Sequence, residues 1–133
     1  MLTNFKKYNY YLIFIFLILF VAGCAPKTFS KSEKVLYTTN QILQNAKNFR
    51  ILALKSAAEY DKQGLLSENK KQKIIKLGDQ LQASINITAQ SLILYKQLGC
   101  TDSTELEKNM QEFNKVFNEF TDLMLPLMYS NHK

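Results

Sequence analysis

The chain has 133 residues, which is the length of a single domain, and it carries a formal net charge of +6. Its one His and two Cys leave too few ligands and bases for a His-based zinc site or a Cys/His nucleophile pair. Four Gly and two Pro are few for a β-rich or loop-rich fold, so the composition favours long helices.

The first 23 residues have the layout of a secretory signal. Lys6 and Lys7 occur without any acidic residue in the first eleven positions, and residues 12–22 are then apolar without interruption. A helix that crosses a membrane needs about 20 apolar residues, and this run falls short of that length. We therefore expect residues 1–23 to be a cleaved signal peptide, with an uncleaved anchor helix as the alternative.

The end of this segment, Val21-Ala22-Gly23-Cys24, resembles the lipobox of bacterial lipoproteins. The resemblance implies cleavage between Gly23 and Cys24, a diacylglycerol thioether on Cys24, and an added acyl chain such as palmitate at the new N-terminus. Two or three acyl chains give stable membrane anchoring. Because Ala25 rather than Asp follows, the resemblance implies the outer membrane in a cell with two membranes. In a cell with one membrane it implies the outer face of the plasma membrane, and in both cases residues 24–31 form a short tether.

Residues 32–129 show helical periodicity in three segments, which predicts an all-α fold. The first helix is expected to begin near Ser30 to Ser32 and to end near Lys62, before Gly64. Its apolar and small positions repeat at spacings of four and three up to Ala53. They are Val35, Thr39, Ile42, Ala46, Phe49, Ala53 and Tyr60, widened by Leu36, Leu43 and Ala57.

The second helix is expected to have Ser67 as its N-cap and to end at Gly99. Its apolar stripe consists of Ile74, Leu77, Leu81, Ile85, Thr88, Leu92 and Tyr95. Gly78 lies on the same face, although a glycine there costs about 1 kcal/mol of helix propensity relative to alanine. We therefore expect a neighbouring helix to approach closely at Gly78.

The third helix is expected to begin at Asp102, with Glu105 completing an arrangement that resembles a capping box. Its stripe consists of Leu106, Met110, Phe113, Phe117, Phe120, Met124 and Leu127. Pro126 should kink or end the helix near Leu125, and residues 130–133 are expected to be a disordered tail. Because both connections are short, neighbouring helices should run antiparallel, and the predicted architecture is an up-down-up three-helix bundle.

Charge is segregated by helix. Residues 27–62 and 68–98 carry net charges of +4 and +3, whereas residues 102–122 carry −4. This pattern adds little stability per exposed pair but disfavours wrong helix orders. The densest basic run, Lys70, Lys71, Lys73 and Lys76, either contacts an anionic polymer or headgroups, or is the solvated start of a helix. No nucleic-acid recognition motif occurs, so no nucleic-acid partner is expected.

The residue pattern predicts no catalytic, cofactor-binding or metal-binding residues, and we expect no enzyme activity and no small-molecule substrate. Phe113, Phe117 and Phe120 either pack in the core or line a ligand cavity. Once Cys24 is lipidated, Cys100 has no partner within the mature chain, so it is either a free thiol or forms an intermolecular disulfide.

The second helix carries a further apolar set, Ile87, Ser91, Leu94 and Leu98, which points away from the core stripe. This set either widens the core face for two neighbouring helices or forms an exposed seam for a partner helix or a second copy. Ile87, Leu94 and Leu98 are therefore the candidate partner surface. The leading hypothesis is a non-enzymatic, membrane-anchored envelope lipoprotein acting as a structural or protein-interaction module. The alternatives are a small-molecule or lipid-binding helical module, and a phage or mobile-element exclusion or lysis accessory lipoprotein.

Overall fold

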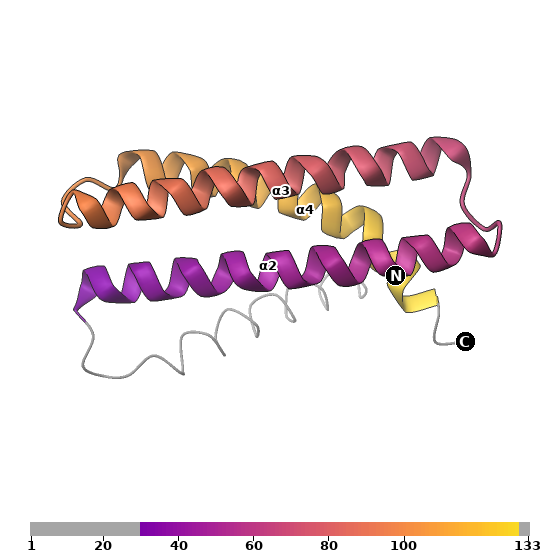
Figure 1. The fold of residues 1–133 in the computed structure, drawn as a ribbon, viewed down its shortest axis with the longest axis horizontal. Coiled ribbons are helices and arrows are strands. Elements are labelled where there is room, and N and C mark those ends of the chain that lie inside the picture. Colours follow the sequence, from indigo (N-terminus) through magenta and orange to yellow (C-terminus); the bar gives the residue numbers. More distant parts are fainter. Residues whose placement is uncertain (1–29, 131–133) are drawn as a thin grey trace, which may run out of the picture. The chain divides into compact units, whose positions relative to one another are not determined.

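The computed structural model describes residues 30–130, which form three helices and contain no strand. Figure 1 shows α2 (Lys31–Lys62), α3 (Glu68–Gln97) and α4 (Thr104–Ser130) in chain order. The predicted all-α fold is confirmed for this part of the chain. The predicted signal peptide, the lipobox with Cys24, and the tail from residue 131 onward lie outside the described residues. The chain divides into two compact units after Gln41, and the packing described below is that of the second unit.

The starts of α2 and α3 follow the sequence prediction. At the start of α2, the Ser30 N–H donates to Oε2 of Glu33 at 2.9 Å, and the Glu33 N–H donates to Ser30 Oγ at 3.3 Å. This reciprocal pair is a capping box. At the start of α3, Ser67 Oγ accepts from the Lys70 N–H at 3.3 Å. Hydroxyl side chains therefore satisfy backbone donors at both helix starts.

The start of α4 differs from the prediction, because α4 begins at Thr104 rather than at Asp102. Oδ1 of Asp102 accepts from the Thr104 N–H at 3.0 Å, two residues along the chain. Aspartate favours this local turn, which occupies its carboxylate before the helix begins. Glu105 instead accepts from the Asn109 side chain, so the predicted capping box of Asp102 and Glu105 does not form.

Of the two expectations for Pro126, a kink or an end near Leu125, the end does not occur, because α4 continues past Pro126 to Ser130. Pro126 removes one backbone donor, yet the final turn has contacts that compensate for this loss. Leu127 is buried in the core. The Ser130 hydroxyl forms a hydrogen bond with the hydroxyl of Tyr60 on α2. These two contacts hold the last turn in place, so Tyr129 and Ser130 belong to the helix.

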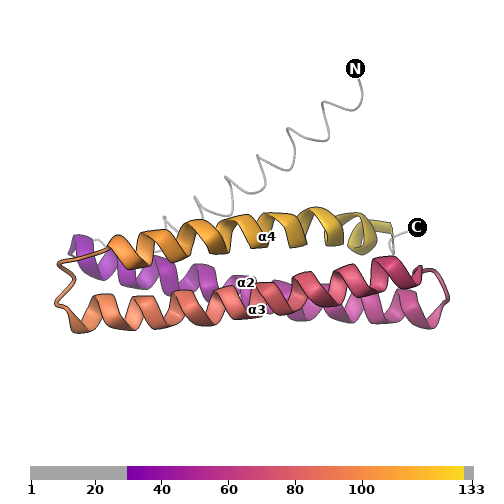
Figure 2. The same ribbon diagram turned by 90° about the horizontal axis from the view of Figure 1, so that it is seen from above.

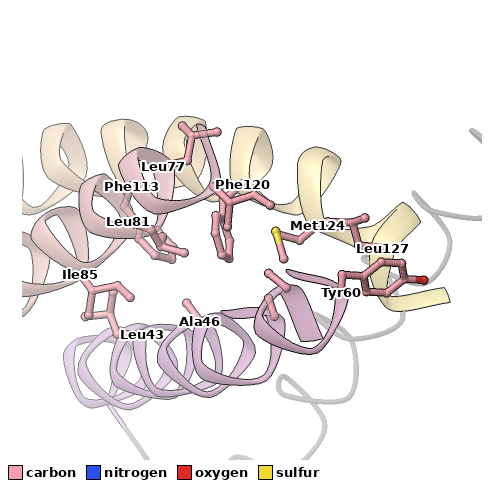
Figure 3. Close-up of a cluster of buried hydrophobic side chains, with 13 residues drawn as sticks. Leu43, Ala46, Tyr60, Leu77, Leu81, Ile85, Phe113, Phe120, Met124 and Leu127 are labelled. Atoms are coloured by element: carbon pink, nitrogen blue, oxygen red, sulfur yellow. The ribbon is translucent and has the colours of Figure 1, made fainter. Parts of the chain in front are cut away.

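From Ile42 onward, α2 runs antiparallel to α3, and α3 runs antiparallel to α4 (Figures 1 and 2). Arg50 of α2 contacts Gly78 of α3, and Asp61 at the end of α2 contacts Lys71 at the start of α3. Between these helices lies one core whose side chains are drawn in Figure 3. The largest fully buried side chains include Phe113, Phe120, Leu81 and Met124.

Gly78 lies in the core at a close helix approach, as the sequence predicts. A Cβ atom added to Gly78 would lie 3.3 Å from Cδ2 of Leu54 on α2 and 3.7 Å from Cε2 of Phe120 on α4. The first distance is tighter than ordinary van der Waals contact. Glycine at this position therefore lowers the helix propensity of α3 but permits the close contact of the three helices.

Candidate interaction surface on α3

The three residues predicted as a partner surface are exposed: Ile87 and Leu94 lie on α3, and Leu98 is the C-cap residue directly after Gln97. Ile87, Leu94 and Leu98 have 50%, 44% and 49% of their surface exposed, respectively. At 100° per residue they fall within an arc of about 40° of the helix circumference, so they form one line along it. We call these three residues the α3 seam. Of the two interpretations of this apolar set, their exposure favours the exposed seam over a widened core face.

Ser91, which the sequence pattern groups with these residues, faces the core instead. It is 7% exposed. Its hydroxyl donates to the Ile87 carbonyl oxygen at 3.1 Å and accepts from the side-chain amide of Asn109 on α4. The α3 seam therefore lies beside the line where α3 meets α4, and Ser91 belongs to that contact.

Beneath the α3 seam, a polar network connects α3 to α4. The fully buried Thr88 hydroxyl lies 2.7 Å from the Ser84 carbonyl oxygen and 3.2 Å from that of Asn109. The Asn109 amide also donates to Oε1 of Glu105 at 3.2 Å. Buried polar groups with satisfied partners favour a single arrangement of the helices that carry them. The network thus fixes the register of α4 against α3.

An open groove runs between α3 and α4 next to the α3 seam. Its α3 wall includes Gln80, Ala83 and Ile87, and its α4 wall includes Glu112, Lys115 and Glu119 together with Val116. The α3 wall is uncharged, whereas the charges on the α4 wall alternate in sign. The groove therefore combines apolar side chains, Ile87 and Val116, with charged side chains on its α4 wall.

The charge pattern of α3 is a feature that the sequence analysis missed. Residues 80–95 contain no charged side chain, and this is the longest uncharged run within residues 30–130. Exposed helix surfaces in solution ordinarily carry charges opposite their apolar face. The signal was present in the sequence as the interval between Asp79 and Lys96. Ile93, which is 57% exposed, also lies in this interval and was not predicted.

The phenylalanines that could line a ligand cavity instead contact one another. The rings of Phe113 and Phe117 stack with centroids 5.7 Å apart, and the Phe49 ring meets Phe117 and Phe120 edge-on. Phe113 and Phe120 are 1% and 0% exposed. Offset and edge-on pairs of this kind are typical of a filled core, which supports the packing interpretation.

The basic run at the start of α3 is partly paired. Nζ of Lys71 lies 2.8 Å from Oδ2 of Asp61, and this hydrogen bond raises the pKa of Lys71 above its usual value. Lys70, Lys73 and Lys76 are exposed. One member of the run is thus engaged in joining α3 to the end of α2.

Cys100 lies in the connection between α3 and α4, where it has a φ of +59° and is partly exposed. Its N–H donates to the Tyr95 carbonyl oxygen at 2.9 Å, which closes the end of α3. Burial raises the pKa of the Tyr95 phenol, and the nearby Cys100 thiol adds to this effect.

Within residues 30–130, no three His, Cys, Asp or Glu side chains gather where they could hold a metal ion. In the same part of the chain, no helix combines the length and apolar character needed to cross a membrane. Comparison of the chain with protein-family models, with curated proteins and with solved structures finds no match.

Proposed function

We propose that the chain is a non-enzymatic envelope lipoprotein, anchored by a lipid on Cys24, whose helices form an up-down-up bundle and bind a protein through the α3 seam. The observation that carries the docking role is the α3 seam itself. Three aliphatic side chains lie half exposed in one line on a helix that is uncharged for 16 residues. An exposed apolar line on a rigid support is typical of a protein-binding surface.

The energy available from covering the three residues of the α3 seam is modest, about 3 kcal/mol in total, so a stable complex requires further contacts from the partner. Full burial of a Leu or Ile side chain contributes roughly 1.5–3 kcal/mol. Each seam residue is about half exposed, so covering it contributes about 1 kcal/mol. The hydrogen bonds of Thr88, Ser91 and Asn109 keep the α3 seam in place before a partner arrives, which lowers the entropy lost on binding.

The membrane anchor is supported by the basic start, the short apolar run and the lipobox of residues 1–24. Metabolic labelling with a palmitate analogue tests it directly in cells that express the full chain. We expect the label in the parent and in Cys100→Ala, and none in Cys24→Ala. An unlabelled parent would overturn the anchor, and the Cys100→Ala control shows that the label reports on Cys24.

The docking role is tested by crosslinking in intact cells. We expect Ile87→Asp/Leu94→Asp to lose the adducts that the parent forms. The matched control is Ile51→Asp/Leu52→Asp, since these residues are 53% and 58% exposed on α2. The control should keep the adducts, and circular dichroism should show equal helix content in both variants. If the α3 variant keeps these adducts, the assignment of the α3 seam as the docking surface is wrong.

A further inference from the structure

We propose that the groove between α3 and α4 binds an amphipathic helix of another protein, whose apolar face is bordered on one side by Lys or Arg at seven-residue spacing. The apolar side chains of this helix cover the α3 seam, and its basic side chains lie beside Glu105, Glu112 and Glu119 of α4. The inference rests on the docking role proposed above, because it names the class of partner that binds the α3 seam.

The two walls of the groove match in level along the helices. Asn109 of α4 contacts both Thr88 and Ser91 of α3, and Gly78 of α3 faces Phe120 of α4. Because the helices are antiparallel, each step along α3 is matched by an equal step back along α4. Three levels, about 10.5 Å apart at 1.5 Å per residue, therefore pair a neutral residue of α3 with a glutamate of α4. These pairs are Gln80 with Glu119, Ile87 with Glu112, and Leu94 with Glu105.

The three glutamates lie on the side of α4 that borders the groove. Glu112 and Glu119 line the groove together with Val116. At 100° per residue, all three glutamates lie within about 60° of Val116 around α4, whereas Lys115 lies about 100° from it and thus further from α3. Glu105, Glu112 and Glu119 are exposed, and none of them forms an ion pair within residues 30–130. Their negative charge is therefore available to a partner.

The charge of the α4 wall selects a basic partner. A Lys or Arg side chain beside each glutamate is attracted to it, whereas a carboxylate or phosphate in the same place is repelled. Residues 102–122 carry a net charge of −4, so the wider field along α4 has the same sign. Three aliphatic side chains alone do not distinguish one apolar partner from another. The glutamates beside the α3 seam supply that distinction and disfavour anionic headgroups and nucleic acid at this groove.

The spacing of the levels fits a helix better than an extended segment. Levels seven residues apart on α3 and α4 match the heptad repeat by which a further helix packs alongside them. An extended segment places side chains of one face about 6.8 Å apart, so it would meet levels about 10.5 Å apart out of step. A helix in the groove contacts α3 and α4 together, as each helix of a four-helix bundle contacts two neighbours.

Photo-crosslinking in intact cells tests the class of partner. The full chain carries a photoreactive amino acid at Ala83, an exposed position on the α3 wall of the groove. We expect an adduct with another protein, whose crosslinked segment is an amphipathic helix with basic residues at seven-residue spacing, as identified by mass spectrometry. The same amino acid at Ile51, which is 53% exposed on α2, is the control and should not give this adduct. A crosslinked segment without such basic residues, an adduct with lipid or with a second copy of this chain, or no adduct at all would overturn the inference.

The yield of the Ala83 adduct tests the glutamates themselves. Glu112→Gln/Glu119→Gln should lower this yield by about tenfold, because two attractions to basic side chains are lost. The matched control is Glu68→Gln/Glu107→Gln, which removes the same charge from exposed positions outside the groove and should keep the yield. Circular dichroism should show equal helix content in the two variants.

The same adduct separates this inference from the docking role. If Ile87→Asp/Leu94→Asp loses the adduct but Glu112→Gln/Glu119→Gln keeps it in full, the basic partner is wrong and the docking role stands. If Ile87→Asp/Leu94→Asp also keeps the adduct, the docking role is wrong and this inference falls with it.

Discussion

The side chain of Arg50 on α2 donates a hydrogen bond of 2.7 Å from Nε to the carbonyl oxygen of Gly78 on α3. Gly78 is also the position where α2 comes so close that a Cβ would lie 3.3 Å from Leu54 Cδ2. The Arg50 side chain is only 19% exposed, so water is largely kept from this bond. The close approach and the charged donor thus belong to one contact between α2 and α3.

Filling the space at Gly78 should destabilise the fold once the side chain extends beyond Cβ. We expect Gly78→Val to lower the free energy of unfolding by about 2–3 kcal/mol, because its γ carbons enter the space of Leu54 and Phe120. Gly78→Ala should be near neutral, since about 1 kcal/mol of helix propensity offsets the shift of Leu54. Urea unfolding measures both variants. Lys73→Val, on an exposed position of α3, is the control. An equal loss of unfolding free energy in Lys73→Val would show that the effect comes from the helix propensity of valine and not from the contact at Gly78.

Removing the donor of Arg50 should also cost stability. Arg50→Met keeps the aliphatic length but loses the bond to Gly78, and we expect a loss of about 1.5–2 kcal/mol, as for other hydrogen bonds to charged groups. The Arg50 guanidinium also lies 3.7 Å from Asp79, whose side chain is 75% exposed. Asp79→Asn should therefore change stability by less than about 0.5 kcal/mol. Equal losses in the two variants would assign the effect to the ion pair.

The helix limits show how much of the fold the sequence predicts. Ser67 and Gly99 bound α3 as expected, because a hydroxyl acceptor and a residue with positive φ are local requirements that the residue type meets. The predicted N-cap at Asp102 is wrong, because its carboxylate can either cap a helix or close a local turn with the Thr104 N–H. The turn that leads into α4 decides between the two. The turn past Pro126 contains the hydrogen bond of Ser130 with Tyr60, which is 70 residues distant in sequence. No local pattern contains that information.

The predicted core face of α3 is also partly wrong, because it includes Leu92 and leaves out Ser84 and Ser91. The buried positions Ser84 and Ser91 continue a spacing of three and four residues, whereas Leu92 is only partly buried. In a straight α-helix, residues seven positions apart differ by about 20° in their direction around the axis. The buried face of a long packed helix therefore rotates slowly along its length. The serines reach the core because their hydroxyls donate to the Leu81 and Ile87 carbonyl oxygens of their own helix. The residues of the α3 seam were found from hydrophobicity alone, but hydrophobicity could not show which side Ser91 faces.

The hydrogen bond between Tyr60 and Ser130 should control the last turn of α4. We expect Tyr60→Phe to speed amide exchange in the last turn after Pro126 by about tenfold, equivalent to about 1.4 kcal/mol of local stability. Exchange in the middle of α3 should change less. Tyr129→Phe removes a hydroxyl that is exposed in the same turn and is the control. Similar acceleration in both variants would show that the contact with α2 is not what holds this turn.

The turn before α4 should depend on pH through Asp102. The hydrogen bond from the Thr104 N–H favours the carboxylate and lowers the pKa of Asp102 below its ordinary value of 3.8. Its stabilising contribution is therefore present above pH 3.8 and is lost as the pH falls through the lower pKa of the folded state. Carboxyl-carbon NMR should give a midpoint below 3.8 for Asp102. Asp102→Asn should reduce the difference in stability between neutral and acid pH. An NMR midpoint for Asp102 above its ordinary value would contradict the hydrogen bond from the Thr104 N–H.

The polar network under the α3 seam should act as a unit. Asn109 donates to Ser91, and the Asn109 carbonyl oxygen lies 3.2 Å from the Thr88 hydroxyl. We expect Ser91→Ala and Asn109→Ala to be non-additive, with a coupling of about 0.5–1.5 kcal/mol in urea unfolding, because each removes the partner of the other. A cycle of Ser91→Ala with Glu119→Gln, which share no hydrogen bond, should be additive within about 0.5 kcal/mol. Additivity in both cycles would mean that apolar packing alone sets the register of α4 against α3, so that the α3 seam would not depend on this network for its position.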